Sequence, residues 1–125
     1  MIELVVVGAR GRLGSLVVVE AQKRASEFAV RAQIGRSDSL ADALRDLVRD
    51  LQRVVVVDVS TASAAAANAA SCAMARAAYV IGTTGLAADA LTALDDAAAS
   101  VPVLHAANFS VSAHVAGKLV ADAAA

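Results

Sequence analysis

Residues able to do chemistry in this 125-residue sequence gather directly after short valine-rich runs. The first run, residues 2–7, leads into GARGRLG, where Gly8, Gly11 and Gly14 are spaced three apart. Glycines at a strand-to-helix turn allow a tight backbone that can approach a pyrophosphate, and the N-terminus of the next helix offers free N–H donors. The spacing favours dinucleotide binding, with a simple structural turn as the alternative. Arg10 and Arg12 either add positive charge near phosphates or are solvated.

A second polar group follows residues 28–34. An NAD site usually has an acidic residue here, about 20 residues past the glycines, to hold the ribose hydroxyls. Gly35 occupies that place, and Arg36 and Ser37 follow. A guanidinium beside a hydroxyl suits an adenosine 2′-phosphate, which favours NADP(H) over NAD(H) as the cofactor. The alternatives are a solvated loop charge for Arg36 and a helix N-cap for Ser37 or Asp38.

Two further polar groups follow later apolar runs. Asp58 lies within one of these runs, and a buried carboxylate there needs donors from loop amides or hydroxyls such as that of Ser60. In IGTTGL, residues 81–86, Thr83 and Thr84 offer hydroxyls either to a nicotinamide carboxamide or to the start of the next helix. In an α/β sheet, ligands bind at the carboxyl ends of the strands, so all these loops are expected at one edge.

The elements that would position these loops alternate along the chain. Apolar runs without period-two alternation favour strands covered on both faces, and they lie at residues 2–7, 28–34, 53–59, 79–82 and 101–106. Helix-length segments follow them at residues 12–25, 39–52, 62–77, 87–99 and 111–124. The pattern predicts an α/β fold, a Rossmann-like doubly wound parallel sheet of about five strands, with helices on both faces in three layers. We expect residues 1–125 to form one NAD(P)-binding domain.

Composition excludes several classes of function. A formal net charge of −1 supplies no electrostatic surface for nucleic acid, and no run approaches the ~20 apolar residues of a membrane span. The single cysteine, Cys72, excludes an internal disulfide framework and a Cys-rich zinc site. We therefore expect a cytoplasmic protein without metal. His105 and His114 are interpreted as structural, so no catalytic residue is assigned.

Four motifs, in order along the chain, carry a family resemblance: GARGRLG (8–14), VVDVS (56–60), VIGTTG (80–85) and AANFSV (106–111). The sequence resembles the 4-hydroxy-tetrahydrodipicolinate reductase family, also called dihydrodipicolinate reductase, over that family's N-terminal cofactor domain only. The resemblance implies hydride transfer from NADPH or NADH to a cyclic dihydrodipicolinate precursor in the diaminopimelate route to lysine. It implies these cofactor-binding residues: Gly8, Gly11, Arg12, Leu13, Gly14, Arg36, Ser60, Gly82, Thr84, Ala107, Asn108 and Phe109.

Departures from the family pattern bear on function. Val59 stands where the family usually has Phe, and Ser112 replaces a usual Gly. The family's catalytic His and Lys and its Ser-Gly-Thr group lie in a C-terminal domain that this sequence lacks, so we expect cofactor binding with poor turnover. Two alternatives remain: a non-catalytic nucleotide-sensing or partner-binding module, and a scaffold that binds no nucleotide. A homodimer through surface that the missing domain leaves uncovered is a further expectation.

Overall fold

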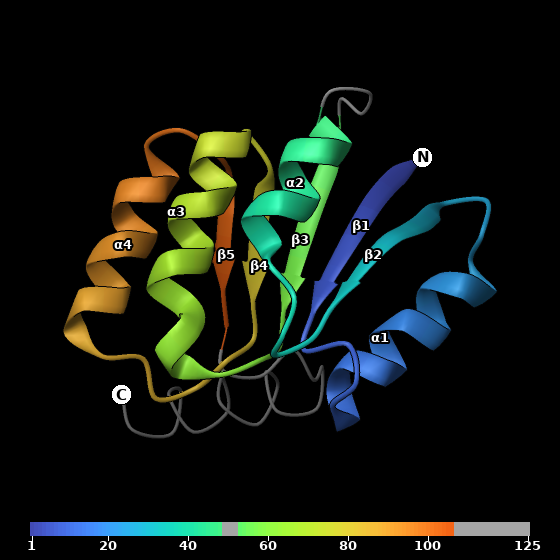
Figure 1. The fold of residues 1–125 in the computed structure, drawn as a ribbon, viewed down its shortest axis with the longest axis horizontal. Coiled ribbons are helices and arrows are strands. Elements are labelled where there is room, and N and C mark those ends of the chain that lie inside the picture. Colours follow the sequence, from blue (N-terminus) through green and yellow to red (C-terminus); the bar gives the residue numbers. More distant parts are fainter. Residues whose placement is uncertain (49–52, 107–125) are drawn as a thin grey trace, which may run out of the picture.

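A computed structural model describes residues 1–48 and 53–106, in which five parallel strands form a single sheet. The strands are β1 (Ile2–Val7), β2 (Phe28–Ile34), β3 (Val54–Asp58), β4 (Ala78–Ile81) and β5 (Val103–His105). Their order across the sheet is β2-β1-β3-β4-β5, and every neighbouring pair is parallel (Figure 1). The predicted Rossmann-like sheet is confirmed.

The helices follow the strands as predicted, with shorter bounds. They are α1 (Arg12–Lys23), α2 (Leu40–Val48), α3 (Ala65–Ala75) and α4 (Ala88–Ala98), with a 3₁₀ turn, η1, over Ala62–Ala64. The expected helix over 62–77 begins as this 3₁₀ turn and stops before Arg76, which adopts a left-handed backbone with φ of 57°. The expected helix over 111–124, and the end of the one over 39–52, lie outside the described residues.

Strand β5 begins at Val103, later than the predicted run of 101–106, because Pro102 has no N–H for a ladder bond. The Pro102 carbonyl still accepts a hydrogen bond of 2.9 Å from the backbone N–H of Tyr79. The valines at 17–19 are helical despite their β-branched side chains. Val18 is buried against the sheet, and this packing overrides the weak helical propensity.

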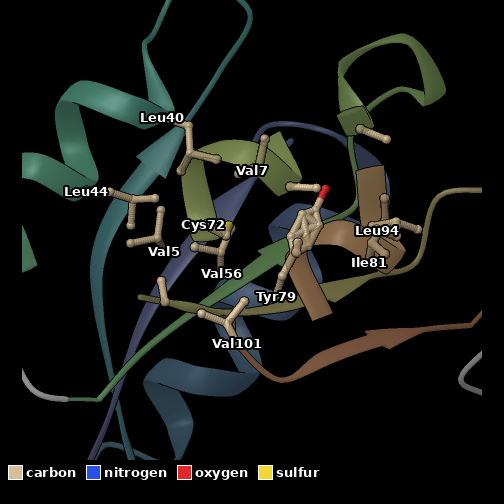
Figure 2. Packing of buried hydrophobic residues seen from close by; sticks show 14 of the residues in the cluster. Val5, Val7, Leu40, Leu44, Val56, Cys72, Tyr79, Ile81, Leu94 and Val101 are labelled. Carbon is tan, nitrogen blue, oxygen red and sulfur yellow. The ribbon is translucent and has the colours of Figure 1, made fainter. Parts of the chain in front are cut away.

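Among residues 1–48 and 53–106, helices cover the two faces of the sheet unequally. Helices α2, α3 and α4 lie side by side on one face, and α1 lies on the other (Figure 1). Alternate side chains of β1 pack on opposite faces of the sheet. Val5 and Val7 belong to the core under α2–α4, whereas Val6 packs with Val18 of α1. Figure 2 shows the larger core, where Tyr79 is its one large ring and its hydroxyl is enclosed.

Within the described part of the chain, α1 is the single helix on its face of the sheet, and an apolar groove of about 580 Å³ runs beside it. Leu4, Val55 and Val57 form its floor, and Leu13 and Leu16 of α1 form one wall. Among the described residues, no helix is long and apolar enough to cross a membrane.

Candidate functional site

A cavity of about 690 Å³ opens at the carboxyl ends of β1, β2 and β3. Chain connections leave the sheet in opposite directions between β1 and β3, which makes this edge the position where α/β sheets bind ligands. The loops after the three strands supply most of the lining, and α2, η1 and α3 supply the rest. The lining residues are Val7, Gly8, Arg10, Gly11, Ile34, Gly35, Arg36, Ser37, Asp38, Leu40, Val59, Ser60, Thr61, Ala64 and Asn68.

The glycine turn after β1 is built by close backbone contacts. Gly8 has a φ of 79°, and a Cβ added to it would lie 2.9 Å from the carbonyl oxygen of Val59. A Cβ on Gly14 would lie 1.9 Å from the carbonyl oxygen of Gly8. Side chains are therefore excluded at both positions, and α1 can approach the loop closely enough to direct its N-terminus at the cavity.

The N-terminus of α1 offers amide donors that have no partner among the described residues. Gly11 precedes the helix in an extended conformation, and no side chain caps it. The first-turn amides of Arg12, Leu13 and Gly14 have no acceptor within the helix. Such a helix start attracts an anion through its N–H groups and its partial positive charge.

The loop after β2 is closed by its own aspartate. Asp38 Oδ2 accepts a 2.7 Å hydrogen bond from the backbone N–H of Gly35. Helix α2 begins at Leu40, and Ser39 caps it by accepting a 3.2 Å bond from the amide of Asp42. The alternative of Ser37 or Asp38 as N-cap is therefore wrong, because the capping hydroxyl comes from the residue directly before the helix.

Two arginines face the same end of the cavity. Arg36 follows β2, and Arg10 extends from the glycine turn, with both side chains exposed. A Cβ on Gly35 would lie 2.8 Å from Arg10 Nη1, so the absence of a side chain at 35 makes room for the Arg10 guanidinium. At the position where an NAD site has an acidic residue, this site has Gly35, with the Arg10 guanidinium next to it.

Asp58, at the end of β3, is fully buried and accepts four hydrogen bonds. Its Oδ1 accepts from the amide of Ser60 at 3.0 Å and from the Ser60 hydroxyl at 2.5 Å. Its Oδ2 accepts from Asn68 Nδ2 at 2.9 Å and from the Tyr79 hydroxyl at 2.5 Å. The expected loop donors are thus confirmed, whereas Asn68 and Tyr79 were not anticipated.

This network perturbs two neighbouring groups. Burial, together with the hydrogen bond to Asp58, raises the pKa of Tyr79 well above its usual range, so the hydroxyl remains a donor. Burial, and then the charge of Asp58, raises the pKa of the Cys72 thiol to about 12. Cys72 is fully buried and suits packing rather than nucleophilic chemistry.

The loop after β4 lies beside Asp58. The amide of Gly82 donates a 2.9 Å hydrogen bond to the backbone carbonyl of Asp58. Helix α4 follows Ala87 with no side-chain cap, so the alternative that Thr83 or Thr84 caps it is wrong. The Thr83 hydroxyl is buried without a partner among the described residues, and Thr84 is exposed. A role for these hydroxyls toward a nicotinamide stays a prediction.

The predicted cofactor-binding residues fall into five groups by location. Gly8, Gly11, Arg36 and Ser60 line the cavity, and Arg12 and Gly14 belong to the helix start beside it. The side chain of Leu13 lines the apolar groove instead, so its backbone amide is the part left for the predicted phosphate contact. Gly82 and Thr84 lie on the adjacent loop after β4, and Ala107, Asn108 and Phe109 lie outside the described residues.

Comparison with known proteins points to one family. The family model described as "Dihydrodipicolinate reductase, N-terminus" matches residues 2–109. A 4-hydroxy-tetrahydrodipicolinate reductase of Gluconobacter oxydans is 41% identical over 110 residues, which cover 84% of this chain and 41% of that protein. Two such reductases from Acinetobacter baumannii strains are 37% and 33% identical, over 88% and 95% of this chain and 37% and 49% of their own lengths. The chain thus spans between about two-fifths and half of these relatives.

Proposed function

The chain belongs to the dihydrodipicolinate reductase family, and on that premise we propose that it is the NADPH-binding domain of a reductase acting on a cyclic imine of the dihydrodipicolinate type. At the coarser level it is an NAD(P)-binding reductase domain with a Rossmann-like fold. The observation that supports the NADPH-binding proposal is the cavity after β1, β2 and β3, with the glycine turn at one side and two arginines at another. The route served is the diaminopimelate route to lysine.

The cofactor's pyrophosphate is assigned to the start of α1. Gly8 and Gly14 leave the backbone without side chains there, and the amides of residues 12–14 have no acceptor in the described part of the chain. Ser60, held by Asp58, and the loop after β4 with Gly82 and Thr84 would line the path toward the nicotinamide. Asn108 and Phe109 complete this end in the proposal.

The bound cofactor supplies the hydride, and the residues of this chain bind and orient it. Cys72 is buried away from the cavity lining, and the described lining holds Asp38 as its one acidic side chain. Asp38 is occupied in closing its own loop. We therefore expect the 125-residue chain alone to bind cofactor and to turn over the family's substrate poorly.

NADPH is proposed as the preferred nucleotide because of Arg36. A guanidinium forms charge-assisted hydrogen bonds with a phosphate, and the loss of such a bond costs roughly 1.5–3 kcal/mol. In Arg36→Ala, NADPH binding should weaken by roughly 10- to 100-fold while NADH binding changes little. Arg45→Ala is a matched control, because Arg45 carries the same charge on the exposed side of α2 and pairs with Asp42.

Fluorescence titration of the reduced nicotinamide measures both affinities on one preparation. Tighter binding of NADPH than NADH, reduced selectively by Arg36→Ala, supports the proposal. Equal affinities unaffected by that substitution would refute the NADPH preference. The absence of any binding, with no rise in thermal stability at saturating nucleotide, would refute the dinucleotide site itself.

A further inference from the structure

Apolar side chains make up part of the cavity lining. They come from Ile34 and the buried Leu40, and from Val59 and Ala64. Arg36, proposed to bind the adenosine ribose phosphate, lies on the loop between Ile34 and Leu40. The purine attached to that ribose would contact these apolar side chains, which offer contact area without a polar cost.

Among the described lining residues, Asn68 has the one carboxamide side chain, and its hydrogen bond to Asp58 fixes which of its two polar atoms faces that carboxylate. Its Nδ2 donates 2.9 Å to Asp58 Oδ2. Four donors converge on Asp58, and a carboxylate accepts but does not donate, so turning the Asn68 oxygen toward it would set acceptor against acceptor.

The oxygen of the Asn68 amide is therefore left for the cavity. Within the described part of the chain, Thr83 Oγ1 is the buried side-chain oxygen that lacks a partner, and Asn68 Oδ1 is not among such buried atoms. Asn68 is half-buried and lines the cavity, with its nitrogen turned inward to Asp58. With its nitrogen bonded to Asp58, the Asn68 amide has its oxygen available as an acceptor for a ligand in the cavity.

We infer that Asn68 reads the adenine base of the cofactor by accepting a hydrogen bond from its exocyclic amine, and that Asp58 is the positioning residue that keeps the Asn68 oxygen toward the base. The inference rests on the proposed dinucleotide site and adds base specificity to it. A purine that carries an acceptor in place of the amine would meet an acceptor in the protein. Hypoxanthine is such a purine.

The test compares NADPH with its reduced hypoxanthine analogue on the full 125-residue chain. Both carry the same fluorescent nicotinamide, so their dissociation constants come from identical titrations. The wild type should bind the adenine form roughly 5- to 10-fold more tightly, the effect of one lost hydrogen bond that leaves an unmet acceptor. In Asn68→Leu the ratio of the two constants should fall to about 1.

Two variants separate recognition from folding. Ser71→Ala removes another polar group from α3, one that bonds only the Ala67 carbonyl, and should leave the ratio unchanged. Asp58→Asn gives position 58 an N–H of its own, so the Asn68 amide is free to turn, and the ratio should fall below about 3. A merely structural role for Asp58 would weaken both nucleotides equally and leave the ratio intact. If Asp58→Asn does not fold, the Asn68→Leu ratio decides.

The outcomes distinguish a wrong role for Asn68 from a wrong assignment of the dinucleotide site. Equal binding of both nucleotides by the wild type, or an undiminished ratio in Asn68→Leu, overturns the role of Asn68 while the dinucleotide site stands. Binding of neither nucleotide overturns the proposed function and this inference together.

Discussion

Replacing Tyr79 by phenylalanine removes one donor from the buried Asp58 carboxylate and leaves the aromatic ring in the core. Both residues are fully buried, and the Tyr79 hydroxyl lies 2.5 Å from Asp58 Oδ2. A hydrogen bond to a charged group contributes about 1.5–3 kcal/mol. Because Ser60 and Asn68 still donate to Asp58, the carboxylate is not left unpaired, and we expect a loss of about 2 kcal/mol. For a domain of this size that lowers Tm by roughly 8 °C.

The pH dependence of this loss tests the mechanism rather than the packing. Burial, then the bond to Asp58, raises the pKa of Tyr79 in the folded protein above the value of about 10 in the unfolded chain. Above about pH 10 the unfolded state therefore binds fewer protons than the folded state, and the stability contributed by Tyr79 falls as pH rises. The difference between wild type and Tyr79→Phe should narrow by about 1.4 kcal/mol per pH unit above pH 10. Cys72, whose raised pKa of about 12 also weakens the fold at high pH, is present in both proteins and cancels.

Urea unfolding at a neutral and at an alkaline pH provides the assay, with equal m-values as the criterion for comparing free energies. Thr92→Val is the control, because its exposed hydroxyl bonds only the Ala88 carbonyl within α4, and it should change stability by less than about 0.5 kcal/mol. A Tyr79→Phe protein as stable as wild type at neutral pH would refute the hydrogen-bond reasoning. A difference that stays constant or widens above pH 10 would refute the assignment of the protonated hydroxyl as donor.

Two further substitutions or labels probe the contacts around the site. Gly14→Ala would bring a Cβ to 1.9 Å from the Gly8 carbonyl oxygen, so we expect it to lower the free energy of unfolding by about 3 kcal/mol and to weaken NADPH binding. Gly85→Ala is the comparison, because Gly85 has open space around it but a φ of 71°. It should lower stability by only about 1–2 kcal/mol, measured in the same thermal melts. Cys72, buried and with its pKa raised to about 12, should resist a thiol reagent at neutral pH until urea unfolds the chain; rapid labelling of the native protein would contradict its placement in the core.

The sheet was predictable because its signal is local. Each strand is a continuous apolar run of a few residues, and each is followed by a helix-length segment, so alternation alone implies a parallel doubly wound sheet. The glycine turn was predictable for the same reason, since Gly8 and Gly14 are close in sequence as well as in space. Boundaries were less accurate where a helix began as a 3₁₀ turn, as at Ala62, because propensity hardly separates the two forms.

The partners of Asp58 were not predictable from local pattern. Asn68 is 10 residues away on α3 and Tyr79 is 21 residues away on β4, so the network depends on the tertiary packing of two other elements. One signal was available: Asn68 interrupts a run of alanines, and a lone amide at such a position requires a hydrogen-bonding partner when it lies against the sheet. The space that Gly35 leaves for Arg10 was hidden likewise, because the two residues belong to different loops.

The small residues of α3 determine which changes this helix can tolerate. Ala65, Ala69 and Cys72 form one buried stripe, and their short side chains let the helix axis lie close to the sheet. That closeness brings Asn68 to within 2.9 Å of Asp58, so a leucine at Ala65 or Ala69 would lift the helix and separate the two polar groups. Substitutions in α3 should therefore be tolerated on its solvent face and restricted to small residues on the face toward the sheet. Charged residues added to this helix by design belong on the solvent face alone.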